Sequence, residues 1–428
     1  MNPGGLSARL GRDFQLLWAG QTVSYLGDRV TLFVVPTVLV FLLGGSAFQV
    51  GLISTAQYLA IPLLSLVAGA LADRWDLRRM LITCDLVRFV AITTIPVAYW
   101  FGRLDVPLLF LCVVVVSAAT VFFNVGYMPA IASIVDSTEL VRGNARMEAS
   151  RTVSELGGPA LAGGLYQGLG IGALLVDSAS YLCSAGAIRA MRPFGKPSRN
   201  GQRILARSLV GLRRNWTDPI LRRSTAGTLL ANLGGPIFVT QMPVLAYQGL
   251  HLSAGLFGAI MSVAAGGAVL GAVLAPRASR WLGSGRMLGL SMVAHSASGL
   301  GILAVPRFPA ILVLTLTLAS YGFFFAWYNI NSAAVRQARI PIPDQTVIHG
   351  AYRTLTWGAI PVSTFVGGWI VSSLAGHTDI LSAAKYTMLA ATVIGISSAL
   401  PLAGMQRLLA TAPPMADPAP APVPVGTA

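Results

Sequence analysis

The sequence predicts an all-α integral membrane protein of about twelve transmembrane helices, arranged as two pseudo-symmetric halves of six. Composition, the length of the apolar blocks and an internal repeat all indicate this fold class. Of the 428 residues, 54% are hydrophobic and only 11% are charged, whereas soluble domains carry about 25% charged residues. The apolar blocks reach the ~20 residues that a helix needs to cross a bilayer. A β-barrel would instead show alternating strands of ~10 residues.

Turn residues and charges divide the apolar blocks into twelve predicted spans. Their approximate bounds are 14–43, 48–72, 79–101, 106–133, 147–168, 170–191, 222–247, 253–276, 286–305, 308–335, 350–375 and 380–403. The first block is too long for a signal-peptide core, so we interpret it as a span. Cys84, Cys112 and Cys183 all lie inside spans and indicate neither a disulfide framework nor a metal site. We expect no cofactor.

Lys and Arg residues predict the orientation. Of the 30, three (Arg103, Arg307 and Lys385) lie on the face away from the termini and two (Arg29 and Arg88) lie within spans, which leaves 25 on the face that carries both termini. The positive-inside rule makes that face cytoplasmic, which predicts a multi-pass plasma-membrane protein with cytoplasmic termini. Anionic lipid head groups are therefore the natural partner of the net charge of +15, and a nucleic acid is not. We expect a monomer.

The spans and charges also divide the chain into segments. A basic stretch without a long apolar block separates two six-span halves, and we interpret it as a solvated linker along the membrane surface, with a regulatory site as the alternative. The predicted segments are a cytoplasmic N-terminus (1–13), the first half (14–191), the basic linker (192–221), the second half (222–408) and a disordered tail rich in Pro and Ala (409–428).

The two halves resemble each other in sequence. AGQTVSYLGD at 19–28 matches AGTLLANLGG at 226–235, an offset of 207, and ADRW at 72–75 matches ASRW at 278–281. Later the offset becomes 202, so that Pro159 matches Pro361. The common order of these matches predicts a duplicated six-helix unit, with the two copies related by an axis along the membrane normal, as in transporters built from parallel repeats.

The loop between the second and third spans reads GALADRWDLRR. It resembles the loop signature of the major facilitator superfamily, in which Gly and Asp-Arg precede a pair of Arg residues, and the matching residues are Gly69, Asp73, Arg74, Arg78 and Arg79. The resemblance implies a major facilitator fold and a loop that locks the cytoplasmic side when the outer side is open. A generic basic turn is the alternative.

Two further stretches resemble members of the same family. GGPALAGG in the fifth span resembles the signature of the family's antiporters, carried by Gly157, Gly158, Pro159, Gly163 and Gly164. Ordinary close packing of small residues is the alternative. DLVR at 85–88 and DSASYL at 177–182 resemble the enterobactin-exporter-like branch of efflux proteins. The fourth span lacks the Arg that many proton-coupled members carry, which leaves the coupling mechanism open.

Asp28 is a carboxylate about fourteen residues into the first span, or about 20 Å at 1.5 Å per residue, near mid-bilayer. Its repeat counterpart is Gly235, so the duplicated scaffold does not require an acid there. A buried carboxylate can bind and release a proton near neutral pH. Asp28 is therefore a candidate for proton coupling with Arg29 beside it, and the alternative is a static ion pair between the two.

Other charges within the spans have structural interpretations. Asp85 and Arg88 are one turn apart and are expected to form a structural ion pair along the third span. Glu155 is one turn from Arg151, and Asp177 follows a Gly-rich turn, where it could cap the outer end of the sixth span.

Polar and aromatic side chains within the spans are candidates for a substrate pathway. Each alone is compatible with helix packing, and together they predict a cavity for a moderately lipophilic solute. The candidates are Gln21, Tyr25, Asn124, Tyr127, Asn232, Trp327, Tyr328 and Asn331.

These features favour a secondary transporter over an enzyme. The leading hypothesis is proton-coupled efflux of a small organic compound (a drug, siderophore or secondary metabolite) by alternating access. Proton-coupled uptake of a small metabolite is the alternative, and a lipid flippase or a sensor stays open. An intramembrane aspartyl hydrolase would need Asp28 and Asp177 in one site, and their expected depths, mid-bilayer and outer end, argue against it. The sequence contains no nucleotide-binding loop of the Gly-x-x-x-x-Gly-Lys type, so we do not expect ATP to be the direct energy source.

Overall fold

Long α-helices make up nearly all of the part of the chain that the computed structural model describes, which is residues 11–72, 75–135, 139–192, 201–305, 307–341 and 344–411. Within these residues, eleven segments are long and apolar enough to cross a membrane. One of them, 157–190, contains the end of one helix and the whole of the next, so the described residues carry about twelve crossings. The predicted all-α membrane fold is confirmed.

Six helices form the first half of the molecule, and the second half repeats their order. The first six are α1 (Arg12–Phe41), α2 (Ala47–Ala72), α3 (Leu77–Trp100), α4 (Val106–Ile134), α5 (Leu140–Leu169) and α6 (Ala173–Ala190). The second half contains α8 (Pro219–Thr240), α9 (Ala254–Leu282), α10 (Ser284–Ser298), α11 (Ala310–Arg339), α12 (Gln345–Trp357), α13 (Ala359–Ala375) and α14 (Ile380–Ser397). Helix α7 (Gly201–Thr217) joins the halves, α15 (Met405–Thr411) follows α14, and short turns of 3-10 or π type are η1 (Gly170–Gly172), η2 (Val244–Gly249), η3 (Gly299–Ala304) and η5 (Leu400–Leu402).

Carboxylates in the loops determine where several helices begin. Asp76, Asp105 and Asp379 each accept a hydrogen bond from the backbone N–H three residues later, at 2.9–3.0 Å. These first-turn N–H groups have no partner within the helix, so a side-chain acceptor there stabilises the helix start.

The predicted span 350–375 consists of two helices, α12 and α13, which are interrupted at Gly358. Pro361 has no N–H to donate to the carbonyl four residues earlier, at Trp357, and its ring crowds that carbonyl. The apolar pattern runs through this break, so the sequence pattern alone predicted one helix.

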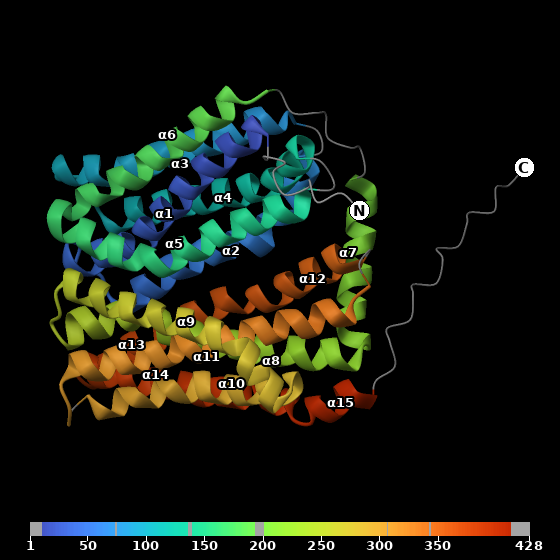
Figure 1. The fold of residues 1–428 in the computed structure, drawn as a ribbon. Helices are drawn as coiled ribbons and strands as arrows, with labels where there is room; N and C mark the ends of the chain where they lie inside the picture. Colours follow the sequence, from blue (N-terminus) through green and yellow to red (C-terminus); the bar gives the residue numbers. More distant parts are fainter. Residues whose placement is uncertain are drawn as a thin grey trace, which may run out of the picture.

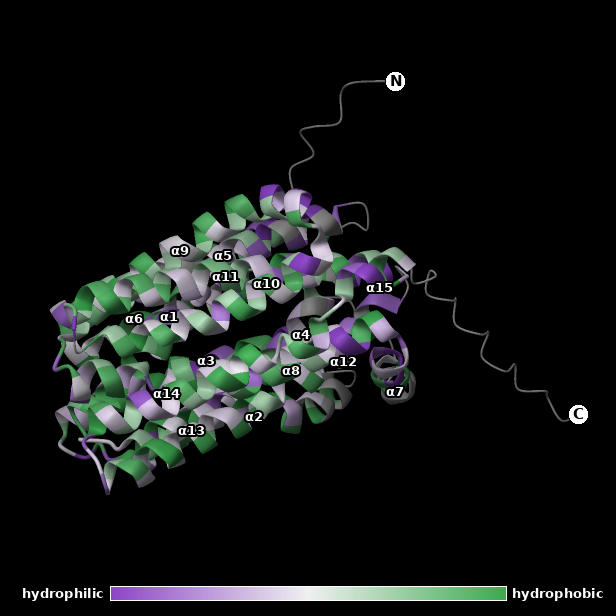
Figure 2. Ribbon diagram, turned by 90° about the horizontal axis from the view of Figure 1, so that it is seen from below, coloured by the Kyte–Doolittle hydropathy of each residue, from purple (hydrophilic) through white to green (hydrophobic). Residues whose placement is uncertain are grey.

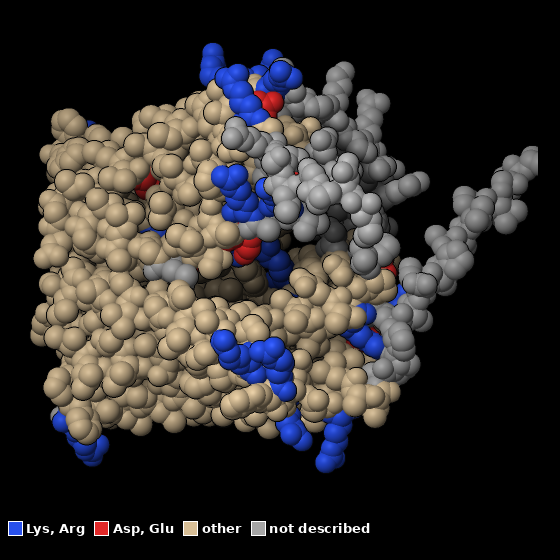
Figure 3. All heavy atoms as spheres, viewed as in Figure 1, with Lys and Arg blue, Asp and Glu red and all other residues tan. Residues whose placement is uncertain are grey.

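The two halves lie side by side as separate layers, with α7 across one end of the molecule (Figure 1). We call this end, where α1 begins, the α7 end. Hydrophobic residues run along the transmembrane helices, while hydrophilic residues gather around α7, α12 and α15 (Figure 2). Most Lys and Arg residues on the face shown in Figure 3 also lie toward the α7 end.

The halves are in contact at the end opposite α7. There the hydroxyls of Thr37 and Tyr247 lie 3.0 Å apart, and those of Thr55 and Thr364 lie 2.9 Å apart. The backbone N–H of Phe48 donates to a side chain of α13 at 2.8 Å. Toward the α7 end, the surface is hollowed between the halves (Figure 3). The protein is therefore closed at the end opposite α7 and hollowed between the halves on the face that Figure 3 shows.

The basic linker differs from the solvated segment that the sequence predicts. Its helix α7 packs on α12, where a Cβ atom on Gly211 would lie 2.6 Å from the carbonyl oxygen of Val347. Asn215 is fully buried and donates from Nδ2 to the carbonyl of Ile348 at 3.0 Å. Because apolar residues recur at helical spacing between the cations, part of the linker can bury one face. The predicted disordered tail begins inside α15, and its residues 412–428 lie outside the described part.

Candidate functional site

Asp28 lies where α1 packs against α6. The hydroxyl of Tyr181 on α6 donates to its Oδ1 atom at 2.7 Å. The two helices approach closely because residue 27 is glycine: a Cβ atom there would overlap Oδ1 of Asp177 and Oγ of Ser180. Helix packing thus holds a carboxylate and a phenol together at the interface between α1 and α6.

The second carboxylate of this interface is Asp177, which is fully buried. It accepts hydrogen bonds from the hydroxyls of Thr31 and Ser180. Thr31 is one turn beyond Gly27 on α1, and Tyr181 is one turn beyond Asp177 on α6. The expected separation of Asp28 and Asp177 in depth is therefore wrong: both acids lie on adjacent turns of the same interface.

Arg29 does not pair with Asp28. Its Nη2 atom lies 2.8 Å from Oε1 of Glu155 on α5, and the side chain passes over Gly158, where a Cβ atom would overlap it. The static Asp28–Arg29 ion pair offered as an alternative is therefore wrong. Adjacent residues point about 100° apart on a helix, and here they face different neighbouring helices.

Asp85 and Arg88 form an ion pair on α3 in which both side chains are buried, 0% and 2% exposed. The Arg88 guanidinium also lies over two aromatic rings, 4.3 Å from the centroid of Phe123 and 4.6 Å from that of Tyr181. Tyr181 therefore contacts both the ion pair on α3 and the carboxylate of Asp28 on α1.

The net charge of this cluster depends on bound protons. Asp28, Asp85 and Asp177 supply three carboxylates, and Arg88 supplies one cation, while Arg29 pairs elsewhere. Two uncompensated negative charges within a membrane-spanning bundle would be costly. The arrangement is thus suited to holding an exchangeable proton, which the hydroxyls of Tyr181, Thr31 and Ser180 can help to place.

The glycines of GGPALAGG have different environments. A Cβ atom on Gly163 would lie 2.8 Å from the Cα of Gly258 on α9, so the two halves make backbone contact there. Gly158 accommodates the side chain of Arg29, as described above. Gly157 and Gly164 have open space around them, and Pro159 lies within α5 without ending it.

The predicted gate loop is only partly described. Asp73 and Arg74 lie outside the described residues, and Gly69 belongs to α2. Arg78 donates to the backbone carbonyl of Arg189 at the end of α6, where a cation is favourable for the helix dipole. Arg79 contributes its backbone N–H to Asp76.

In the first half, the pathway candidates do not form a single cavity wall. Gln21 is buried and donates to the hydroxyl of Ser184 at 2.8 Å, so it faces α6. The hydroxyls of Tyr25 and Tyr127 lie 3.4 Å apart between α1 and α4. Asn124 is exposed.

In the second half, the pathway candidates contact residues of a neighbouring helix or of the helix on which they lie. Asn232 donates to the carbonyl of Thr356 at 2.8 Å, and Asn331 donates to that of Trp327 at 2.9 Å. The Trp327 ring packs against Phe323 and Phe324. Tyr328 is buried and bonds to a threonine of α8.

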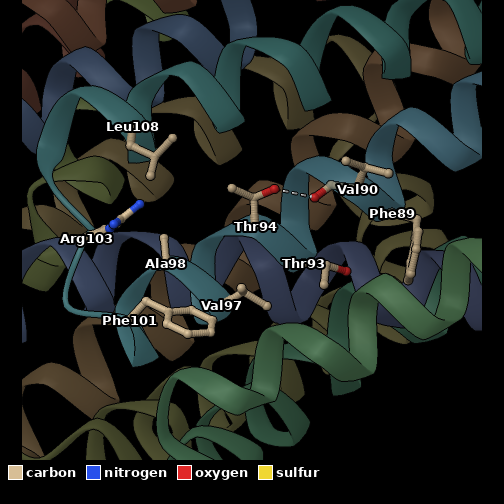
Figure 4. A pocket seen from close by; sticks show the side chains of 9 residues that line it. All are labelled: Phe89, Val90, Thr93, Thr94, Val97, Ala98, Phe101, Arg103 and Leu108. Carbon is tan, nitrogen blue, oxygen red and sulfur yellow. Dashed lines mark hydrogen bonds between the residues drawn. The ribbon is translucent and has the colours of Figure 1, made fainter.

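A lateral groove of about 740 Å³ lies away from the acidic cluster. Its walls are mainly side chains of α3, including Val90 and Val97. Phe101, just beyond the end of α3, also lines it, and Arg103 and Leu108 lie at one end (Figure 4). Val90 and Phe101 are 60% and 77% exposed, so this is an outward-facing groove of the first half.

The chain belongs to the Major Facilitator Superfamily, since residues 17–364 match that family. It is therefore a secondary transporter of small molecules, not an enzyme. Among curated relatives, the multidrug efflux pump Tap of Mycolicibacterium fortuitum is 27% identical over 371 residues, which cover 83% of this chain and 88% of the relative. Tap of Mycobacterium tuberculosis is also 27% identical, over 377 residues that cover 84% and 87%.

Solved structures show the same fold. A bacterial homologue of the human lysosomal transporter Spinster has a TM-score of 0.71 and 14% identity, covering 95% of this chain and 98% of its own. A bacterial homologue of the iron transporter ferroportin has a TM-score of 0.67 and 17% identity, covering 91% and 98%.

Proposed function

We propose that this transporter exports a moderately lipophilic organic compound in exchange for protons, with Asp28 as the residue that carries the proton. The observation that supports this most directly is the cluster of three carboxylates and one guanidinium. Among the described residues, Asp28 has a phenol as its hydrogen-bond partner and forms no ion pair, whereas Arg88 pairs with Asp85. A protonated Asp28 cannot accept from Tyr181 in the same way, so loading and release of the proton would alter the α1–α6 contact.

Export is favoured over uptake by the relatives, which are named multidrug efflux pumps. The backbone contact between Gly163 and Gly258 supports a role of the antiporter-like stretch in bringing the halves together. We also propose that the protein belongs to the enterobactin-exporter-like branch, which is consistent with these relatives. We further propose that it works as a monomer and that anionic lipids surround its basic end.

We infer that the α7 end is cytoplasmic, because most Lys and Arg residues belong to that face. The structure would then be open to the cytoplasm, and the loop of Asp73 and Arg74 would help to close that side in the opposite state. Reporter fusions after residue 200 and at the C-terminus should both give cytoplasmic signals. A periplasmic signal from either would overturn the orientation.

Everted membrane vesicles test the direction and the energy source together. Respiration acidifies their interior, so a proton-coupled exporter should accumulate fluorescent lipophilic compounds inside, and a protonophore should stop this. Accumulation only in right-side-out vesicles would favour uptake, and protonophore-resistant accumulation would exclude proton coupling.

A further inference from the structure

Arg336 lies three residues before the end of α11. Its guanidinium carbon is 3.6 Å from the ring centroid of Tyr352 on α12. Two of its nitrogen atoms, Nε and Nη1, are buried and have no hydrogen-bond partner. Stacking thus fixes the plane of a cation in which two nitrogen atoms have unpaired N–H groups.

The groups around Arg336 do not neutralise it. The hydroxyls of Tyr328 and Tyr352 both bond to Oγ1 of Thr228, with 2.8 Å to Tyr352, and Thr228 itself donates to a backbone carbonyl of α8. The two phenols are therefore donors to Thr228. His349 lies within electrostatic range, and its Nε2 atom is also buried without a partner.

Two other arginines among the described residues, with side chains 2% and 11% exposed, have carboxylate partners. Arg88 pairs with Asp85, and Arg339 pairs with Asp218 at 2.6 Å. Among the described residues, no Asp or Glu lies within 4 Å of Arg336. Burying guanidinium N–H groups without an acceptor is costly, so an acceptor from outside this cluster would stabilise the arrangement.

The internal repeat indicates that the scaffold does not need this cation. At the offset of 202 that relates Phe122 to Phe324, the counterpart of Arg336 is Ile134. The first half thus builds the same helix with an apolar residue at this place. Arg336 is specific to the second half, as Asp28 is to the first.

We propose that Arg336, stacked on Tyr352, is a subsite for an anionic oxygen group of the transported compound, such as a carboxylate, a sulfonate or a phosphate. The planar guanidinium can give two parallel hydrogen bonds to such a group. This assignment rests on the proposed export function and narrows its substrates to amphiphilic anions.

Binding to the purified protein in nanodiscs tests the subsite without any gradient. The probes are naphthalene-2-carboxylate and its uncharged analogue naphthalene-2-carboxamide, and the readout is the ligand-induced rise in melting temperature. The carboxylate should bind the wild-type protein more tightly than the carboxamide does. Arg336→Gln should weaken the affinity for the carboxylate roughly tenfold to a hundredfold, the effect expected from the loss of charge-assisted hydrogen bonds. The carboxamide should bind both proteins equally, which shows that the variant is folded.

Two further variants test whether the effect is specific to the guanidinium of Arg336. Arg336→Lys should give an intermediate affinity, and Arg353→Gln is the matched control, since Arg353 also stacks on an aromatic ring of α12, Trp357, at 4.4 Å. Equal carboxylate affinity in wild type and Arg336→Gln, or an equal loss in Arg353→Gln, would overturn the assignment.

A lipid phosphate could supply the same chemistry. In phosphatidylcholine nanodiscs the carboxylate effect should match that in discs containing phosphatidylglycerol. If phosphatidylglycerol abolishes carboxylate binding in an Arg336-dependent way, the occupant is a lipid head group and the substrate assignment is wrong. Because this titration uses no gradient, a failure of proton coupling in the vesicle assay and a failure of the anion subsite here give different results.

Discussion

The phenol of Tyr181 on α6 donates a 2.7 Å hydrogen bond to Asp28 on α1 while the guanidinium of Arg88 on α3 lies 4.6 Å from the centre of its ring. One side chain therefore connects a carboxylate within the first helix to a buried ion pair on a third helix. A change of charge at Asp28 must alter this contact, because an ionised carboxylate is a stronger acceptor for the phenol than a protonated one. The relationship links proton binding to the packing of three helices.

Tyr181→Phe should weaken this link without removing the carboxylate. We expect a loss of about 1–3 kcal/mol in the free energy of unfolding, the range for a buried hydrogen bond to a charged group, and a severalfold lower accumulation driven by a pH gradient. Thermal unfolding and vesicle transport measure the two effects. Tyr25→Phe is the matched control, since its hydroxyl contact with Tyr127 is long, at 3.4 Å. Equal effects of the two variants would contradict the special role of Tyr181.

Arg29→Gln should leave proton coupling intact. Arg29 pairs with Glu155, and the two side chains are 30% and 42% exposed, so we expect the pair to contribute at most about 1 kcal/mol to stability. Transport driven by a pH gradient should stay near the wild-type rate. Loss of driven transport in a folded Arg29→Gln protein would show that Arg29 acts on Asp28, which would contradict the pairing of Arg29 with Glu155.

Gly163→Ala should loosen the closed end of the molecule. The added methyl group would lie 2.8 Å from the Cα of Gly258, and overpacking of this kind costs about 1–3 kcal/mol. In a background without native cysteines, Thr37→Cys, placed at the closed end, should then react faster with a membrane-impermeant maleimide. Gly164→Ala is the control because its site is open. Identical labelling rates in both variants would show that this contact does not hold the end closed.

Arg339→Met should destabilise the corner between α7 and α8. Arg339 binds Oδ2 of Asp218 through two nitrogen atoms, at 2.6 and 2.8 Å, and the two side chains are 11% and 7% exposed. Leaving a buried carboxylate unpaired costs about 3–5 kcal/mol. Adding Asp218→Asn should recover part of this loss, since the amide oxygen can still accept from the start of α8. A double variant as unstable as the single one would mean that Arg339 acts through other contacts. Chemical unfolding measures both.

The sequence predicted the fold well because its signals are local. Apolar blocks long enough to span a bilayer, cations on one face and two matching halves need no knowledge of packing. Asp28 was also found locally, as a charge within an apolar block. The break at Gly358 was missed because hydropathy is continuous across it.

The rest of the site depends on the axial register of neighbouring helices, which no single segment encodes. Asp177 was placed too far from Asp28 because its depth was counted from a Gly-rich turn, whereas contact at Gly27 sets the register of α1 against α6. Tyr181 was missed because a tyrosine in an apolar block is indistinguishable from a packing residue, although DSASYL pointed to this stretch. Arg336 was missed because it lies just beyond the predicted end of its span, at residue 335. The sequence pattern therefore assigned it to the basic loop that follows.

If Asp28 couples proton movement to transport, replacing its carboxylate by an amide should separate the two. Proteoliposomes containing wild type or Asp28→Asn are given a pH gradient and, separately, equal substrate on both sides, with a compound identified in the vesicle assay. Wild type should accumulate substrate against its gradient. Asp28→Asn should show no driven accumulation yet still exchange labelled for unlabelled substrate, because the amide keeps the size of the side chain and an oxygen atom that can accept, more weakly, from Tyr181. Driven accumulation by Asp28→Asn at the wild-type level would exclude Asp28 as the residue that couples proton movement to transport.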